Sequence, residues 1–173
     1  MLTEKLSFGI LAQEMEIKPR RPSEALSDWP MFRGNPERTG VTQAQLSLPL
    51  DLQWSYEAGE AIESSAAISQ NLAFFGTLDG IFHAVDLKTG QGKWKFPART
   101  GISSSPCVSE GVVYFGDEEG IFYALEAATG KLRWKFQTGA EIMSSPSCIK
   151  GQVLFGSYDS HIYSLSTGDG SLQ

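Results

Sequence analysis

The sequence predicts an all-β fold built from repeats of about 40 residues, and three observations support it. First, Trp54, Trp94 and Trp134 lie 40 residues apart. Second, other positions recur at this spacing, namely Ser64, Ser104 and Ser144; Phe75, Phe115 and Phe155; Gly76, Gly116 and Gly156; Gly90, Gly130 and Gly170. Third, each repeat contains short segments rich in aromatic and β-branched residues, without the 3.6-residue period of a helix. A repeated, strand-rich unit of this length indicates a propeller.

Each repeat has four segments that suit strands. In the second copy these are residues 104–109, 111–116, 121–126 and 132–137. The two middle segments are joined by tight-hairpin sequences, Thr77–Gly80, Asp117–Gly120 and Ser157–Ser160. In the first two an acid precedes Gly, which accepts positive φ without steric cost. Ser160 in place of Gly makes the third turn the weakest. Both middle segments are apolar on successive residues, so both faces of the sheet are expected to be covered. Four antiparallel strands packed between neighbours are typical of a propeller blade.

The chain divides into three parts. Residues 1–27 are predicted to be a polar leader, either a short helix or without regular structure, with no signal peptide and no membrane span. Residues 28–50 are predicted to be an irregular segment, pinned to the body by Trp29 and Phe32, because its prolines and glycines exclude a central strand. Residues 51–173 hold the repeats.

The strand count predicts an open arc of about three blades. One strand is expected at Leu52–Ala58, followed by two full sets of four and a final set of three. Closed propellers have about four to eight blades, so three should leave end faces and strand edges exposed. One hypothesis is that copies of the chain complete the ring by donating the Leu52–Ala58 strand. The alternative is a truncated gene or an excised piece of a longer propeller.

Composition excludes some classes of function. The chain is 41% hydrophobic and 20% charged, with a net charge of −6 and no block of like charge, so a nucleic-acid partner is not expected. The two cysteines, Cys107 and Cys148, lie one position out of the repeat register. That offset points them to opposite faces of equivalent strands, so buried free thiols are expected rather than a disulfide.

The run from Ala84 to Trp94 reads Ala-x-acid-x-x-Thr-Gly and ends in Trp, as does the run from Ala124 to Trp134. Together with the Ser-Ser-Pro segments and the opening Trp-Pro-Met-Phe-Arg-Gly-Asn, these runs resemble the pyrroloquinoline-quinone-like (PQQ-like) β-propeller repeat family over residues 28–173. The family includes quinoprotein alcohol dehydrogenases and the outer-membrane assembly lipoprotein of Gram-negative bacteria. Its tryptophan-docking motif implies that the indole of one blade packs against the Ala and the Thr-Gly turn of its neighbour. The structural docking residues are then Trp54, Trp94, Trp134, Ala84, Thr89, Gly90, Ala124, Thr129 and Gly130.

No catalytic, cofactor-binding or metal-binding residue is predicted. In the family that this chain resembles, the quinoprotein enzymes hold their cofactor on the propeller axis with a Trp floor, a lid of adjacent cysteines and calcium ligands. This chain has no adjacent cysteines, so the resemblance does not imply such a site here. His83 and His161 occupy different registers and are interpreted as strand histidines. The serine pairs are interpreted as packing residues, Thr89–Gly92 as a turn, and the recurring acids Asp79, Glu119 and Asp159 as hairpin residues rather than a cation site.

Three functions remain open. The favoured one is a non-enzymatic propeller scaffold or protein-interaction module, whose partners are other proteins or copies of itself, without a cofactor and without membrane insertion. The second is a fragment of a quinoprotein dehydrogenase, which would bind PQQ with calcium. The third is a sensor or accessory domain of a receptor-like protein. Relatives in the family are mostly periplasmic or exported, and the compartment stays open.

Overall fold

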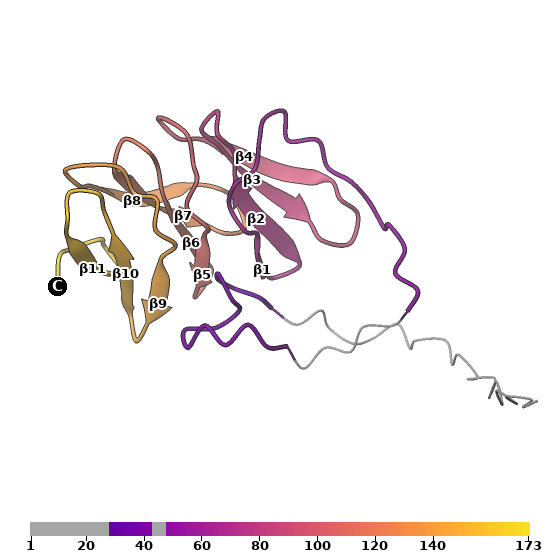
Figure 1. Cartoon of the computed structure of the whole chain (residues 1–173), viewed down its shortest axis with the longest axis horizontal. Coiled ribbons are helices and arrows are strands. Elements are labelled where there is room, and N and C mark those ends of the chain that lie inside the picture. Colours follow the sequence, from indigo (N-terminus) through magenta and orange to yellow (C-terminus); the bar gives the residue numbers. More distant parts are fainter. Residues whose placement is uncertain (1–27, 43–47) are drawn as a thin grey trace, which may run out of the picture.

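A computed structural model describes residues 28–42 and 48–173, drawn in colour in Figure 1. The leader predicted for residues 1–27 lies outside the described residues, as do residues 43–47. Within the described ranges, no helix is long and apolar enough to cross a membrane.

The described residues form eleven strands in three antiparallel sheets, which we call blades 1, 2 and 3. Blade 1 contains β1 (Ala67–Ser69), β2 (Leu72–Gly76), β3 (Ile81–Asp86) and β4 (Gly92–Pro97). Blade 2 contains β5 (Cys107–Ser109), β6 (Val112–Gly116), β7 (Ile121–Glu126) and β8 (Leu132–Gln137). Blade 3 contains β9 (Ser147–Ile149), β10 (Gln152–Gly156) and β11 (Ile162–Ser166). In each blade the strands pair in chain order, as expected of a blade built from consecutive hairpins.

The three blades lie side by side and form a partial propeller (Figure 1). Their first strands are neighbours, since β1 contacts β5 and β5 contacts β9, so these strands form the inner side of the arc. One apolar cluster fills the boundary between blades 1 and 2, and a second fills the boundary between blades 2 and 3. The prediction of an all-β open arc of about three blades is therefore confirmed.

Burial follows the position of each sheet in the arc. Every residue of β6 is buried, and so are the first five residues of β7, because blade 2 is covered on both faces. β8 alternates in exposure because it is the outer strand of blade 2, as does β4 of blade 1. By contrast, β10 of blade 3 alternates where its equivalent β6 is buried throughout. An alternating strand has one covered face. The outward face of blade 3 is thus left uncovered by the described residues.

Two predicted strands differ from the structure: one is absent and the other is shorter than expected. Leu52–Ala58 is not a strand, because no neighbouring strand among the described residues pairs with its backbone. The innermost strand of blade 2, predicted over residues 104–109, is only Cys107–Ser109. The serines before it serve another purpose: the hydroxyl of Ser104 accepts a hydrogen bond from the Gly116 N–H and donates one to its carbonyl. Ser64 and Ser144 bond Gly76 and Gly156 in the same way.

The hairpin turns have the predicted backbone. Gly80 and Gly120 adopt φ of 82° and 81°, and Ser160 takes their place in blade 3 with φ of 71°. A side chain is disfavoured in this left-handed region. The third turn therefore keeps the geometry of the other two in spite of its serine.

Candidate functional site

Three tryptophans make the same contact with the following blade. The indole N–H of Trp54 donates to the Leu87 carbonyl at 2.9 Å, that of Trp94 to the Ala127 carbonyl at 3.0 Å, and that of Trp134 to the Thr167 carbonyl at 3.1 Å. Each indole also lies against the glycine of the turn that it bonds. A Cβ on Gly130 would lie 2.6 Å from a ring carbon of Trp94, so only glycine permits this approach. The same holds for Gly90 against Trp54 and Gly170 against Trp134.

The other residues of the motif shape the turn that receives the indole. The Thr89 hydroxyl donates to Asp86, and the Thr129 hydroxyl donates to Glu126. The two alanines lie elsewhere: Ala84 is the cross-strand neighbour of Trp94 in its own blade, and Ala124 is that of Trp134. Both alanines are fully buried. The motif thus combines a tight pairing within one blade with a receiving turn for the tryptophan of the blade before it.

Asp86 is the charged residue of the first receiving turn. Its carboxylate bonds Lys93, at 3.1 Å, and accepts from the backbone and the hydroxyl of Thr89. The hydrogen bond from Lys93, followed by those from Thr89, lowers the pKa of Asp86 to about 2. The ionised form is thus favoured in the folded chain.

Replacing Asp86 by Asn is expected to flatten the acid limb of the stability profile. Because the folded pKa lies below the unfolded value, the ionised carboxylate stabilises the fold above about pH 4, and this contribution is lost as the pH falls toward 2. Thermal unfolding of both proteins between pH 2 and 7 measures the difference, which should be largest near neutrality and vanish at about pH 2. A constant offset between the two curves would contradict the assignment.

A second kind of contact, which the sequence analysis did not predict, joins the blades through aromatic pairs. Phe82 stacks on Phe115 with 4.0 Å between ring centroids, and Phe122 stacks on Phe155 with 3.9 Å. Phe82 and Phe122 are equivalent positions 40 residues apart, and both are fully buried. The next equivalent position is Ile162. The recurrence of phenylalanine at positions 82 and 122 was the signal in the sequence that could have indicated this contact.

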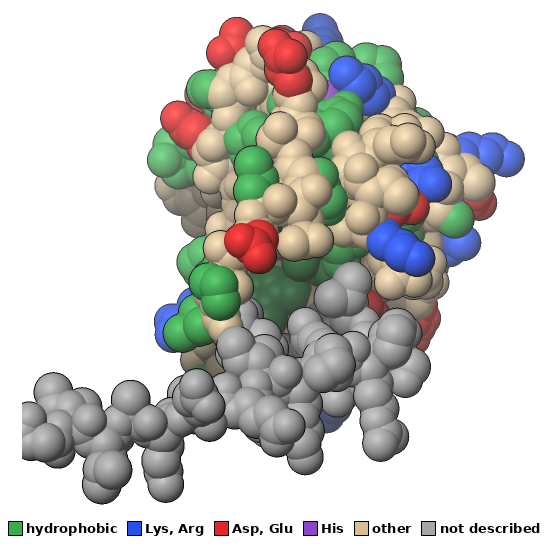
Figure 2. Space-filling model, turned by 90° about the vertical axis from the view of Figure 1, so that its right-hand side faces the viewer, with side chains coloured by type: hydrophobic (Ala, Val, Ile, Leu, Met, Phe, Trp, Pro, Cys, Tyr) green, Lys and Arg blue, Asp and Glu red, His purple; other side chains and the backbone are tan. Residues whose placement is uncertain are grey.

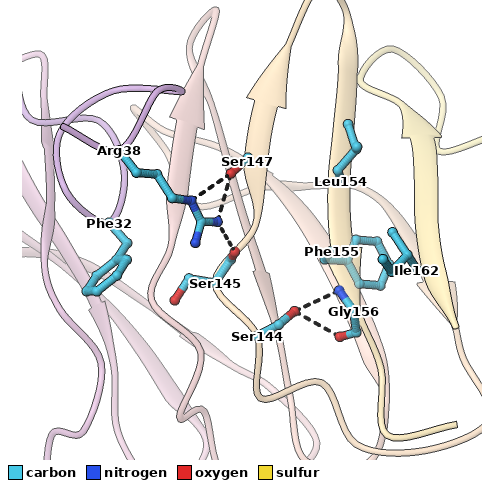
Figure 3. Close-up of a pocket in the computed structure, with 9 residues that line it drawn as sticks. All are labelled: Phe32, Arg38, Ser144, Ser145, Ser147, Leu154, Phe155, Gly156 and Ile162. Carbon is cyan, nitrogen blue, oxygen red and sulfur yellow. Dashed lines mark hydrogen bonds between the residues drawn. The ribbon is translucent and has the colours of Figure 1, made fainter. Parts of the chain in front are cut away.

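Ile162 lies on the outward face of blade 3 and is 83% exposed. This face is hollowed by an open pocket of about 600 Å³ (Figure 3). On the opposite side of the pocket are Phe32 and Arg38, from the segment that precedes blade 1. The lining residues are Phe32, Arg38, Ser144, Ser145, Ser147, Leu154, Phe155, Gly156 and Ile162.

The segment 28–40 crosses the inner strands of all three blades. The backbones of Trp29 and Ile68 exchange two hydrogen bonds at 2.8 Å, so Trp29 pairs with β1. The Pro30 carbonyl accepts from Val108 of β5 at 2.7 Å. Farther along, the Arg38 guanidinium donates to the Ser145 carbonyl and to the Ser147 hydroxyl, each at 2.8 Å (Figure 3). The segment therefore occupies the inner side of the arc, which faces the axis of a propeller.

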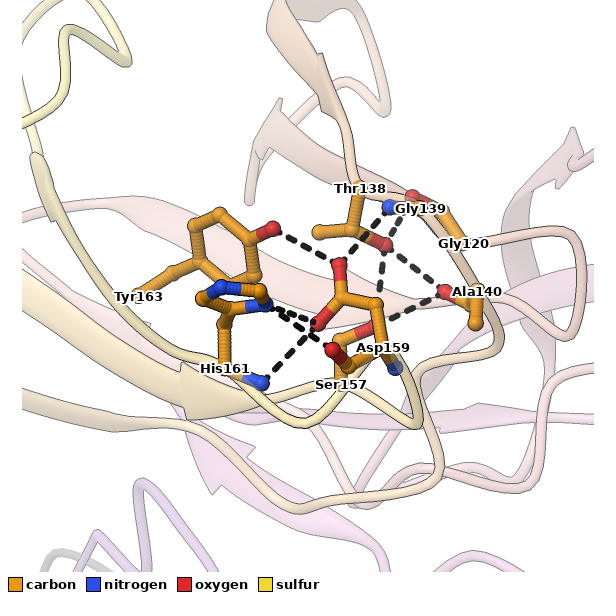
Figure 4. Close-up of polar contacts among 8 residues, drawn as sticks. All are labelled: Gly120, Thr138, Gly139, Ala140, Ser157, Asp159, His161 and Tyr163. Carbon is orange, nitrogen blue, oxygen red and sulfur yellow. Dashed lines mark hydrogen bonds and ion pairs between the residues drawn. The ribbon is translucent and has the colours of Figure 1, made fainter.

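Asp159 organises the rim of blade 3 (Figure 4). Its carboxylate accepts from the Tyr163 hydroxyl at 2.7 Å, from the Gly139 N–H at 2.8 Å and from the His161 N–H at 3.0 Å. These hydrogen bonds hold the pKa of Asp159 well below its usual range. Gly139 belongs to the connection from blade 2, so this acid links two blades. Within the described residues, no group of three metal-binding side chains occurs.

The two histidines differ in burial and in their position relative to the strands. His83 is fully buried in β3, where its ring stacks on Phe75 and bonds the Tyr56 hydroxyl at 3.2 Å. Burial, with the charge of Lys95, lowers the pKa of His83. His161 lies just before β11 rather than within a strand, with its side chain 71% exposed beside Asp159. The equivalent residues Ile81 and Ile121 begin strands because they pair with the fourth strand of their blades, which blade 3 lacks among the described residues.

The two cysteines are free and buried, as predicted. They lie on opposite faces of equivalent strands, as expected, but this does not separate them, because their Sγ atoms lie 2.7 Å from one another across the boundary of blades 2 and 3. Opposite faces of equivalent strands in successive blades are turned toward the same boundary. The one-residue offset therefore brings the thiols together.

Charge is mixed over the surface at the blade 1 end of the arc. Figure 2 shows acidic and basic side chains interspersed with hydrophobic ones, and neither sign of charge dominates this face. The absence of a nucleic-acid partner stays a prediction.

Residues 78–173 match the family model described as outer membrane protein assembly factor BamB. A search of curated proteins finds no match. Among solved structures, BamB from Moraxella catarrhalis is 24% identical with a TM-score of 0.64, over 69% of this chain and 38% of that chain. The quinohemoprotein alcohol dehydrogenase from Comamonas testosteroni is 23% identical with a TM-score of 0.71, over 84% of this chain and 26% of that chain.

The computationally designed Ika4 protein is 21% identical with a TM-score of 0.66, over 72% of this chain and 78% of that chain. These similarities show a β-propeller fold, and the chain spans well under half the length of the two natural proteins. The family match covers more than half of the chain and begins in the turn between β2 and β3. The chain therefore belongs to the PQQ-like repeat family whose model is described as outer membrane protein assembly factor BamB.

Proposed function

We propose that the chain is a non-enzymatic β-propeller segment that binds protein through the outward face of blade 3. The observation that carries this proposal is the exposure of Ile162, which is 83% against 0% at the equivalent Phe82 and Phe122. Those two positions bury their side chains against the next blade. The outward face of blade 3 is built like the faces that pack between blades but is exposed, so another protein sheet is the partner that it fits best.

The tryptophan contacts support a packing role for the motif. In this proposal Trp54, Trp94 and Trp134 hold successive blades together, with Thr89, Gly90, Thr129 and Gly130 forming the turns that receive them. Each indole gains a hydrogen bond and buries apolar area at a blade boundary. None of these residues is then left for a cofactor.

The segment 28–40, which we call the inner segment, also supports a non-enzymatic role. Trp29 and Pro30 bond the inner strands of blades 1 and 2, and Arg38 bonds the inner end of blade 3. A cofactor on the propeller axis would have to share this side of the arc with residues 28–40. The description of the family as an assembly factor is consistent with binding to proteins.

The partner that we propose is a second copy of the chain. β11 is the last strand of its sheet, and Leu172 and Gln173 of the same chain already bond part of its outer edge, at Leu165 and Ser164. The rest of that edge is open, and an edge strand accepts a further strand. At the other end of the arc, Leu52–Ala58 already places Trp54 and Tyr56 against blade 1, as the outer strand of a preceding blade would. Residues 54–58 of another copy would continue along β11 the strand that Leu172 and Gln173 begin, and two copies would bring together six blades.

Changing Ile162 to Asp is expected to weaken self-association of the 173-residue chain at least about tenfold, because a carboxylate would be buried without a partner. Size exclusion coupled to light scattering measures the mass over a range of concentrations. Tyr158→Asp is the matched control, since Tyr158 is 70% exposed in the β10–β11 turn and not on the blade face. A wild-type chain that stays monomeric at all concentrations would contradict self-association.

Titration of the same protein with PQQ and calcium tests the non-enzymatic part of the proposal. No change in quinone absorbance and no dye-linked alcohol oxidation are expected. Saturable quinone binding with alcohol oxidation would overturn the proposal in favour of a dehydrogenase fragment.

A further inference from the structure

Two cysteine thiols face one another in the core between blades 2 and 3. Cys107 is the first residue of β5, and Cys148 is the middle residue of β9. Their exposed fractions are 0% and 6%, and their Sγ atoms are 2.7 Å apart. Both belong to the apolar cluster that also contains Met31 of the inner segment.

The repeats show that this pair is particular to one boundary. The position of Cys107 is occupied by Ala67 in blade 1 and by Ser147 in blade 3. The position of Cys148 is occupied by Ile68 and by Val108. The boundary between blades 1 and 2 therefore has no thiol at either position, whereas the boundary between blades 2 and 3 has one on each side.

We propose that Cys107 and Cys148 form a disulfide that joins the inner strands of blades 2 and 3. The Sγ–Sγ distance in a disulfide is about 2.0 Å, so the sulfur atoms need to approach by less than 1 Å from their present separation. The adjacent inner strands β5 and β9 already hold the two residues across this boundary. This inference does not depend on the proposed function.

The oxidant in this proposal is a small-molecule disulfide such as oxidised glutathione. One cysteine thiolate attacks a sulfur of glutathione disulfide, which forms a mixed disulfide and releases one glutathione. The second cysteine thiolate attacks the protein sulfur of that mixed disulfide, forms the Cys107–Cys148 bond and releases the second glutathione. The two thiols lose two protons and two electrons, and the glutathione disulfide gains them.

Burial determines when this exchange takes place. The contact with Cys107, together with burial, raises the pKa of Cys148, and a protonated, enclosed thiol reacts slowly with a disulfide. The exchange should therefore occur before blades 2 and 3 close upon one another. Once formed, the bond closes a loop that contains strands β6 to β8 and restricts the unfolded chain.

The experiment compares the full chain refolded with a reduced and oxidised glutathione mixture against the chain refolded with reductant alone. After the glutathione mixture, titration of thiols in denaturant should find none, and intact mass should fall by two hydrogen atoms. Non-reducing tryptic mapping should recover a linked pair of peptides, since Lys131, Arg133 and Lys135 separate the two cysteines. The melting temperature should rise by roughly 5–15 °C over the reduced chain.

Matched variants come from the repeats themselves. Cys107→Ala copies the residue of blade 1, and Cys148→Val copies the residue of blade 2. In either single variant, and in the double variant, oxidised glutathione should leave the melting temperature unchanged. The thiol count and peptide map of the wild-type chain stand even if a variant fails to fold.

Three results would overturn the proposal. These are two titratable thiols in the wild-type chain after refolding with glutathione disulfide, a stable glutathione adduct on either cysteine, or a disulfide between two chains.

Discussion

Replacing Phe122 by Ala is expected to lower the free energy of unfolding by about 3–5 kcal/mol. The Phe122 ring is fully buried and stacks on Phe155 of blade 3 at 3.9 Å between centroids. Its loss removes apolar burial and leaves a cavity at a boundary that cannot close without moving two sheets. Denaturant unfolding monitored by tryptophan fluorescence measures the change.

The equivalent position in blade 3 supplies the control. Ile162→Ala removes a side chain that is 83% exposed, so its effect on the isolated chain should stay within about 0.5 kcal/mol. If both variants lost equal stability at concentrations where the chain is a monomer, the aromatic stack would not be the source of the effect. Phe82→Ala should resemble Phe122→Ala, because Phe82 makes the same stack with Phe115.

Replacing Trp94 by Ala is expected to lower the free energy of unfolding by about 2–4 kcal/mol. The indole is half-buried, packs near the rings of Phe74 and Phe82, and donates to the Ala127 carbonyl of blade 2. Its removal therefore weakens blade 1 and its boundary with blade 2 together. Equilibrium unfolding in urea, followed by far-ultraviolet circular dichroism, measures the loss without relying on tryptophan emission.

Trp94→Phe separates packing from hydrogen bonding. This variant keeps most of the apolar area and loses the N–H donor, so a smaller loss of about 1–2 kcal/mol is expected. Lys95→Ala changes the adjacent residue on the other face of β4 and should have little effect. Equal losses for the Ala and Phe variants would assign the whole contribution to the hydrogen bond, against the packing role proposed for the motif.

The local features of the fold could be predicted from the sequence because they depend on residues close together in the chain. The hairpin between β6 and β7 needs positive φ at Gly120, and the sequence places a glycine there. The continuous apolar run of β6 indicated burial on both faces, and every residue of that strand is buried. The strand at Leu52–Ala58 was predicted wrongly for the complementary reason, because a strand needs a neighbour that local sequence cannot supply.

Contacts between blades depended on tertiary structure. Phe82 and Phe115 are 33 residues apart, and nothing local to either residue indicates that their rings stack. The path of residues 28–40 along the inner strands was likewise not predicted. Of the two expected anchors, Phe32 is 39% exposed, whereas its neighbour Met31 is buried at 4%. Arg38 bonds serine residues more than 100 positions away.

The repeat, the four-stranded blade, the hairpin turns and the open arc could all be inferred from the amino-acid sequence alone. These follow from a period of 40 residues and from local backbone and burial preferences. The side-chain contacts at the blade boundaries, including the facing thiols of Cys107 and Cys148, depend instead on how the sheets pack. The reason is physical: faces that are opposite within one repeated sheet become adjacent when successive sheets stack, and the stacking is set by long-range packing rather than by the local chain.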